Sequence, residues 1–105
     1  MKTIKRKKIN RRPSSPGEIL KDIFLDGNGI SQASFAQSLS DLTGGKVKTS
    51  TMRTKLSEVI KQKRSMSADF AVLISNVLGT NPKMWMNLQT SLDLWIAEKE
   101  FDEAS

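Results

Sequence analysis

The sequence predicts an all-α protein built from five amphipathic helices. Every cluster of apolar residues follows helical spacing, and no stretch alternates apolar and polar residues as a half-buried strand would. Residues that favour helix starts, such as Ser and Asn, precede these clusters, and glycine follows most of them. A chain of 105 residues is long enough for one modest hydrophobic core. We therefore expect one helical domain over residues 15–100.

The first helix is expected to begin at Ser15 and to end at residues 27–29. Ser15, Pro16 and Glu18 fit a capping box in which proline takes the first helical position. Glycine at positions 27 and 29 ends the helix. The apolar stripe of this helix is expected to contain Ile19, Leu20, Ile23 and Phe24.

The second and third helices are shorter. Ser31 is placed to cap the second helix, and residues 43–45 stop it; the expected inward residues are Phe35, Ala36, Leu39 and Leu42. The third helix is expected to start near residues 49–51, where Ser50 could serve as an ordinary cap. Its expected inward residues are Met52, Leu56, Val59 and Ile60.

The fourth helix is capped by Ser67 and stopped by Gly79, and its expected stripe is Phe70, Leu73, Ile74, Val77 and Leu78. Asn81 and Pro82 open a fifth and longest helix, which is expected to run to about Glu100. Residues 101–105 are interpreted as an acidic tail.

The net charge of +6 is unevenly distributed along the chain. Residues 1–15 carry seven basic side chains and no acid, and residues 46–64 carry seven more against the single acid Glu58. Beyond residue 65 acids predominate. Residues 1–14 have almost no apolar content, so we expect a disordered basic arm. This distribution favours a protein with one face for a polyanion.

Composition argues against several classes of function. The sequence has no cysteine and no histidine, so it lacks thiolate ligands and the commonest general base. Its acids are scattered, and we expect no enzyme, no metal site and no cofactor. No apolar run approaches the roughly 20 residues of a membrane span, and no apolar region follows the charged N-terminus as in a signal peptide. We expect a cytoplasmic protein without a membrane partner.

Residues 31–67 fit a helix-turn-helix. Two short helices are joined by a glycine-bearing connection, and the second opens with hydroxyl and basic residues. A recognition helix needs short polar and long basic side chains on its groove-facing side and apolar residues on the other. The expected DNA-binding residues are Gln32, Ser50, Thr51, Arg53, Thr54, Lys55 and Ser57, with Lys61, Lys63 and Arg64 on phosphates. The alternative is an ordinary solvated face.

The fifth helix carries a heavy apolar stripe of Trp85, Leu88, Leu92, Trp95 and Ile96. These residues can complete the core or form a two-fold dimer interface, because tryptophan is enriched at interface centres and helix-turn-helix proteins bind palindromes as dimers. We expect both: Trp85 and Leu88 pointing inward, and a homodimer interface that includes Leu92, Trp95 and Ile96.

The chain resembles the HigA-type antitoxins, which belong to the XRE branch of helix-turn-helix regulators and are related to the phage repressors. The resemblance covers residues 13 to about 100 and rests on residues 15–20, 31–32, 63–67, 78–80, 84–89 and 93–95, including "PGEIL", "NLQ" and "DLW". It implies a phage-repressor-like five-helix bundle that represses its own operon as a dimer on operator DNA. It also implies a partner toxin, typically a RelE-fold ribonuclease that cleaves messenger RNA on ribosomes.

Two other functions stay open, namely a helix-turn-helix repressor without a toxin and a basic RNA-binding protein. Polybasic arms serve RNA as well as DNA, but both tryptophans lie away from the basic zones, so no stacking platform is evident.

The sequence departs from the family pattern in two places. The connection over residues 43–50 is longer than usual, with an apparent insertion at residues 44–46, and the arm before Pro13 exceeds what the family core requires. We expect the arm to fold against a partner, with the toxin ranked ahead of DNA. Its charge favours DNA, whereas two apolar anchors favour a protein surface. The expected toxin-binding residues are Ile4, Arg6, Ile9 and Arg11.

Overall fold

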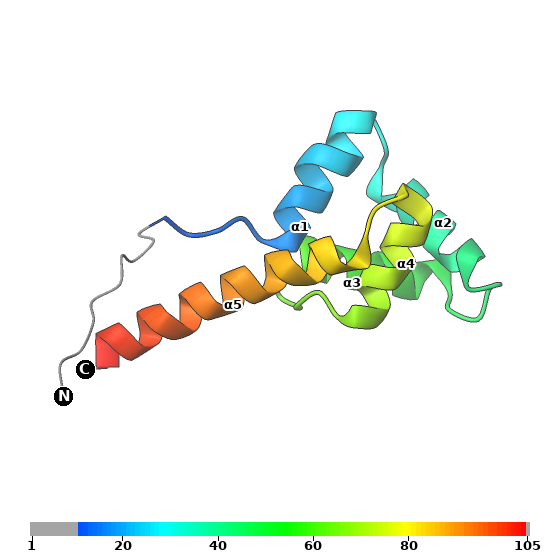
Figure 1. Cartoon of the computed structure of the whole chain (residues 1–105). Helices are drawn as coiled ribbons and strands as arrows, with labels where there is room; N and C mark the ends of the chain where they lie inside the picture. Colours follow the sequence, from blue (N-terminus) through cyan, green and yellow to red (C-terminus); the bar gives the residue numbers. More distant parts are fainter. Residues whose placement is uncertain (1–10, 105) are drawn as a thin grey trace.

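The computed structural model describes residues 11–104, and over that range the chain contains five main helices and no strand (Figure 1). The first helical segment is α1 (Pro16–Ile19), which continues without a break as η1 (Leu20–Leu25) and η2 (Asp26–Asn28). The other helices are α2 (Gln32–Leu42), α3 (Thr49–Ile60), α4 (Ala68–Leu78) and α5 (Pro82–Ala104). The predicted all-α fold of helix-turn-helix type is confirmed. Most of the predicted basic arm, residues 1–10, lies outside the described residues.

Three helices begin at the predicted serines. The side-chain oxygen of Ser15 accepts a hydrogen bond from the amide of Glu18 at 3.1 Å, and Ser31 and Ser67 accept from Ser34 at 3.0 Å and from Phe70 at 3.2 Å. Each bond satisfies an amide that has no partner within its helix. The suggestion that Ser50 caps α3 was wrong, because the N-cap residue is Lys48 and no side chain caps this helix.

The first helical segment contains a π-helix that the sequence pattern did not predict. The amide of Asp26 donates to the carbonyl of Lys21, a hydrogen bond that spans five residues instead of four. This wider coil rotates less per residue, so Leu25 reaches the core while Ile23, predicted to point inward, is 57% exposed. Leu42 was also expected inward and is exposed, because α2 ends there and Val47 packs against the core instead.

Trp85 on α5 lies at the centre of the core and is fully buried. Its ring contacts that of Phe24 with centroids 5.3 Å apart, and its indole nitrogen donates to the hydroxyl of Thr80 at 2.8 Å. The side-chain carbonyl of the buried Gln89 accepts from the amide of Met66 at 2.8 Å. These contacts join α5 to the first helical segment and to the chain on both sides of α4.

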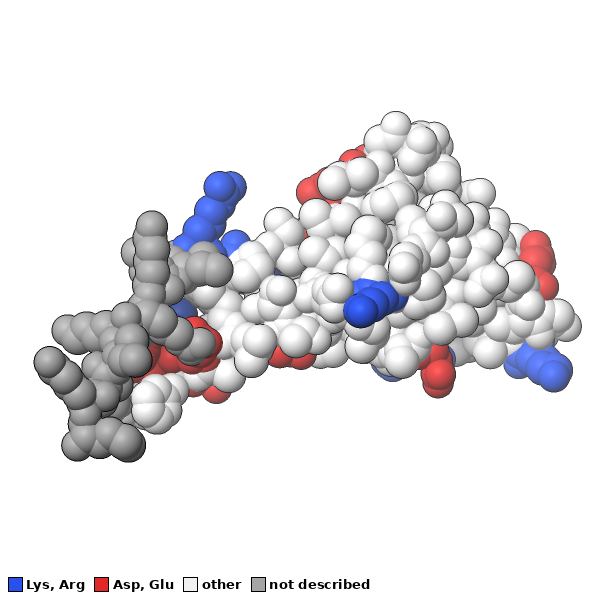
Figure 2. Space-filling view, in the orientation of Figure 1, with Lys and Arg blue, Asp and Glu red and all other residues white. Residues whose placement is uncertain are grey.

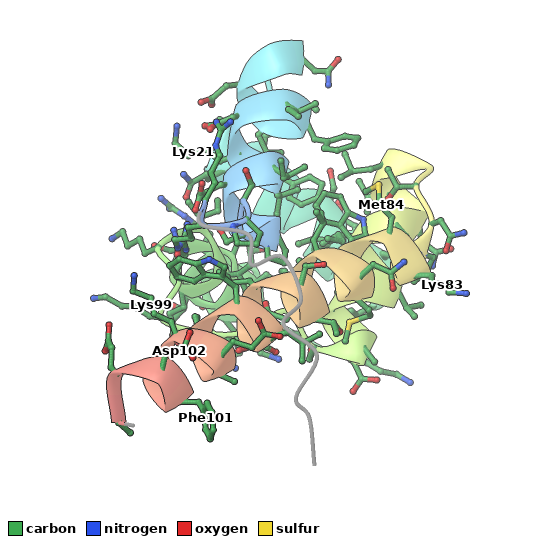
Figure 3. All side chains as sticks on the ribbon, turned by 60° about the vertical axis from the view of Figure 1, so that its left-hand side comes forward. Lys21, Lys83, Met84, Lys99, Phe101 and Asp102 are labelled. Atoms are coloured by element: carbon green, nitrogen blue, oxygen red, sulfur yellow. The ribbon has the colours of Figure 1, made fainter. Side chains whose placement is uncertain are left out.

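The far half of α5 extends away from the other helices (Figure 1). The helix runs to Ala104, so the expected end near Glu100 was too early and residues 101–104 are helical instead of forming a separate tail. Figure 3 shows Lys99, Phe101 and Asp102 on these last turns. The Lys99 ammonium lies 5.1 Å from the centroid of the Trp95 ring.

Candidate nucleic-acid interface

The connection between α2 and α3 is held by three side-chain contacts. The Ser40 hydroxyl donates to the Val47 carbonyl at 2.7 Å, the Thr43 hydroxyl donates to the Ser40 carbonyl at 2.7 Å, and the Val47 amide donates to the Thr43 hydroxyl at 3.2 Å. Gly44 and Gly45 have φ angles of 67° and 79°, a region that L-residues avoid. The connection, although longer than expected for the family, therefore follows one defined path into α3.

Both ends of α3 are fixed against neighbouring helices. At its start, the Thr49 hydroxyl donates to the side-chain carbonyl of Gln37 on α2 at 3.0 Å. Near its end, the backbone of Val59 abuts Gly17 on α1, where a Cβ atom would lie only 2.1 Å from the Val59 carbonyl oxygen. The buried residues Met52, Leu56 and Val59 attach the inner face of α3 to the core. The outer face of α3 is thus presented on a rigid support.

Six predicted DNA-binding residues meet around one hollow on the surface. The first turn of α2, the outer face of α3 and the turn that follows α3 line it together, and its residues are Gln32, Arg53, Thr54, Ser57, Glu58, Lys61 and Lys63. Of these, only Glu58 was not predicted. Glu58 is the single acid among the basic residues 46–64, and this was the only feature of the sequence that could have singled it out.

The other predicted DNA-binding residues lie outside the hollow. Ser50 and Thr51 are exposed on the first turn of α3, and Lys55 is half-buried on the same helix. Arg64 does not line the hollow, but its Nε lies 3.2 Å from a carboxylate oxygen of Glu58, which does. Unlike Lys61 and Lys63, with which the sequence grouped it, Arg64 is thus held in an ion pair beside the hollow.

The hollow brings three exposed basic side chains together. On the face shown in Figure 2, charged side chains are few and most of the described surface is neutral. Arg53, Lys61 and Lys63, by contrast, are exposed and share one hollow. Three cations outnumber the one carboxylate, Glu58, around a hollow that also holds hydroxyl and amide groups. This composition suits a phosphate backbone with polar groups beside it.

The predicted dimer-interface residues and the predicted arm residues differ in where the structure places them. Leu92 was predicted to lie in a dimer interface, but it is only 5% exposed and packs within its own chain, whereas Trp95 is half-buried and Ile96 is 39% exposed. Of the predicted arm residues, Ile4, Arg6 and Ile9 lie outside the described residues, and Arg11 is exposed at the first described position.

Residues 11–104 contain no group of three or more side chains able to hold a metal ion. No helix within residues 11–104 carries an apolar stretch of the length that a membrane span requires.

Comparisons with known proteins identify the family. No protein-family model matches the chain. An HTH-type transcriptional regulator of Haemophilus influenzae is 31% identical, with 91% of this chain and 82% of the relative covered. Antitoxin HigA-1 of Vibrio cholerae is 30% identical, with 92% and 82% covered. The chain belongs to the HigA family of helix-turn-helix antitoxins.

A solved structure of the Pseudomonas aeruginosa antitoxin HigA with the higBA promoter is similar in fold to this HigA-family chain. The TM-score is 0.72 at 32% identity, and the match covers 89% of this chain and 90% of the other. The resemblance seen in the sequence is confirmed. The named relatives are transcriptional regulators and antitoxins, which also confirms the prediction that the chain is not an enzyme.

Proposed function

We propose that this protein is an antitoxin and transcriptional autorepressor that binds operator DNA as a dimer through α2 and α3. The observation that carries the proposal is the hollow in which Gln32, Arg53 and Lys61 meet from three different segments. The similar Pseudomonas aeruginosa HigA was solved with a promoter, which supports DNA as the polyanion that this surface binds.

In this proposal α3 is the recognition helix and enters the major groove. Arg53 is long enough to bond the O6 and N7 atoms of a guanine, and the Thr54 hydroxyl can reach a base edge beside it. Lys61 and Lys63 contact phosphates, while Gln32 contacts the backbone or a base from the start of α2. Because buried side chains fix the inner face of α3, its outer face meets the groove in one orientation.

The first turn of α3 adds a second set of groups. No side chain caps this helix, so its first amides can donate to a phosphate oxygen, as helix N-termini often do. The exposed hydroxyls of Ser50 and Thr51 lie on the same turn. These residues therefore keep a role in the proposal as backbone contacts, although they lie outside the hollow.

DNA binding is tested by fluorescence anisotropy with a labelled duplex from the region upstream of the protein's own gene and a shuffled duplex of the same composition. We expect the upstream duplex to bind at least about a thousandfold more tightly at physiological salt. Equal affinity for the two duplexes would contradict sequence-specific repression. Tighter binding to an RNA hairpin in the same assay would favour the RNA-binding alternative.

We further propose that the protein neutralises a partner toxin, which the resemblance implies to be a ribonuclease of the RelE fold. The name of its Vibrio cholerae relative, an antitoxin, supports a toxin partner. Co-expression with the product of the adjacent gene should yield a co-purifying complex and restore growth that this product alone arrests. Growth arrest that persists without a complex would favour a repressor that has no toxin.

The basic arm is proposed as the toxin-binding segment. A variant without residues 1–10 keeps Arg11 and Arg12, so it leaves the described part of the chain intact. We expect this variant to lose neutralisation while its operator affinity changes little. If operator binding weakens strongly and neutralisation survives, the arm binds DNA instead.

A further inference from the structure

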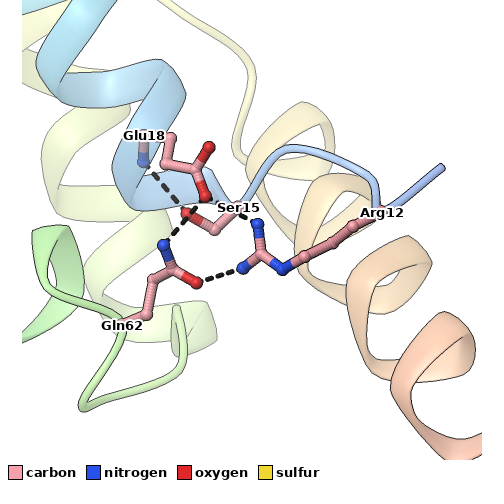
Figure 4. Close-up of polar contacts among 4 residues, drawn as sticks. All are labelled: Arg12, Ser15, Glu18 and Gln62. Carbon is pink, nitrogen blue, oxygen red and sulfur yellow. Dashed lines mark hydrogen bonds and ion pairs between the residues drawn. The ribbon is translucent and has the colours of Figure 1, made fainter.

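Three polar side chains join the start of α1 to the turn after α3 (Figure 4). Arg12 donates from Nη1 to the Glu18 carboxylate at 2.9 Å and from Nη2 to the side-chain carbonyl of Gln62. The side-chain amide of Gln62 in turn donates to the same Glu18 oxygen at 2.8 Å. Each residue thus contacts the other two, and we call this closed set of contacts the clasp.

Gln62 has an unusual backbone for its residue type. Its φ angle is +62°, and it is the only residue other than glycine with a positive φ among residues 11–104. This conformation is unfavourable for L-residues and is normally assigned to glycine. A non-glycine residue held there indicates that its side chain has a role, because glycine would fit the same backbone with less strain.

The turn that Gln62 occupies carries two cations of the candidate DNA surface. Lys61 precedes Gln62 and Lys63 follows it, and both line the hollow. The backbone of this turn closes on α3, since the Gln62 amide donates to the Val59 carbonyl at 3.1 Å and the Lys63 amide to the Glu58 carbonyl at 2.8 Å. The path of this turn therefore decides where the two ammonium groups point.

Glu18 is well placed to hold the turn at residues 61–63 in position. It lies in the first turn of α1, next to Gly17, whose lack of a side chain lets α1 approach the backbone of Val59. The hydrogen bond from Arg12 is the main cause that lowers the pKa of Glu18, so its carboxylate stays charged to a lower pH than that of an ordinary glutamate. The clasp thus connects a buried helix contact to an exposed turn.

We propose that Arg12, Glu18 and Gln62 are positioning residues for DNA binding: they hold the turn at residues 61–63 so that Lys61 and Lys63 reach phosphates. This inference rests on the proposed function. The three residues do not themselves contact DNA. The side chains of Arg12 and Glu18 are 37% and 36% exposed, and exposed ion pairs of this kind contribute little to folding stability.

The first test is Gln62→Gly, which keeps the backbone conformation and removes the side chain without changing the net charge. We expect its affinity for the upstream duplex to fall about 3- to 30-fold. The slope of log affinity against log salt should decrease in magnitude by about 0.9 to 1.8, as one or two phosphate contacts are lost. A purely structural role would lower the active fraction of the protein and leave this slope unchanged.

The second test uses the sign of a charge effect. Glu18→Gln retains a residue that can complete the capping box but removes one negative charge. Simple electrostatics predicts tighter DNA binding for this variant. A clasp weakened by loss of the charge that strengthens the Arg12 bond predicts weaker binding. Asp22→Asn is the matched control, because it removes the same charge from the next turn of the same helical segment. We expect Asp22→Asn to bind DNA as tightly as the wild type or slightly more so.

The outcomes separate this inference from the function on which it rests. If the wild type does not discriminate between the upstream and shuffled duplexes, the proposed function fails. If the wild type does discriminate, but Gln62→Gly keeps its salt slope or Glu18→Gln binds as tightly as Asp22→Asn, the clasp proposal alone is overturned.

Discussion

Arg53 and Lys61 line the same hollow but differ in what they can recognise. A guanidinium can form two parallel bonds to one base, whereas an ammonium is a point charge suited to phosphate. Their geometry places Arg53 on the outer face of α3 and Lys61 directly after the helix. At the scale of single residues, the proposed DNA surface therefore combines a group able to read a base with a group able to bind any phosphate.

The replacement Arg53→Ala should cost about 1–3 kcal/mol of binding free energy on the cognate duplex and much less on a shuffled one. Lys61→Ala should weaken both duplexes alike and reduce the salt slope by about 0.9. Anisotropy titrations at several salt concentrations measure both effects. Unchanged discrimination by the Arg53→Ala protein would remove Arg53 from base recognition.

Gly17 is a residue whose importance lies in the absence of a side chain. A Cβ atom there would lie 2.1 Å from the carbonyl oxygen of Val59 and 2.8 Å from the Cα of Ile60. Gly17→Ala should therefore reduce the free energy of unfolding by about 1–3 kcal/mol or more, because backbone cannot yield as a flexible side chain does. Gly27→Ala is the control, since its nearest contact is 3.5 Å away. Urea denaturation that finds equal stability for both variants would contradict this close approach.

At the scale of helices, caps were predictable and helix geometry was not. Ser15, Ser31 and Ser67 are caps because a local signal, a short hydroxyl side chain before an apolar run, identifies them. The π-helix over Leu20–Leu25 lacks such a signal, since a pattern search assumes ordinary α-helical spacing. The length of α5 was underestimated because solvated acids suit an exposed helix as well as a tail.

Some residues of the candidate site were likewise predictable from the sequence, and others were not. Arg53, Thr54 and Ser57 were predictable because residues three or four apart share a helix face. The contact of Glu58 with Arg64, the clasp around Gln62 and the fit of Gly17 against Val59 were not predictable. Each depends on the path of a loop or on two segments far apart in the sequence, which local periodicity does not encode.

The pH dependence of stability tests the clasp at the start of α1. The pKa of Glu18 is lowered from its ordinary value of 4.5, mainly by the hydrogen bond from Arg12. A carboxyl with a lowered pKa stabilises the folded state at a pH above 4.5, and it loses this contribution as the pH falls through the folded value. The stability difference between wild type and Glu18→Gln should thus be small, as expected for an exposed pair, but full near pH 7 and reduced below pH 4.5. Urea unfolding at each pH measures it, and a constant difference would contradict the lowered pKa.

At the scale of the molecule, the proposed DNA surface and the exposed apolar residues of α5 lie on different helices. The hollow is built from α2, α3 and the turn after α3, whereas Leu94, Ile96 and Phe101 are large apolar residues exposed on α5. Phe101 is 73% exposed on the part of α5 that extends from the other helices (Figure 3). Leu94 and Ile96 point to different faces because residues two apart on a helix do not face each other, but apolar side chains exposed on an extended helix suit a protein interface.

We predict a homodimer formed through α5, with Ile96 and Trp95 in place of the buried Leu92. The replacement Ile96→Asp puts a charge into the interface and should lower the association constant while the monomer stays helical. Val72→Asp is the matched control, because Val72 is also exposed and apolar but lies on α4. Sedimentation velocity at micromolar concentration should show dimers for wild type and Val72→Asp and monomers for Ile96→Asp. A stable wild-type monomer would contradict this interface. It would also contradict the expected palindromic operator, because two copies of α3 reach half-sites about one helical turn apart only if a two-fold axis relates them.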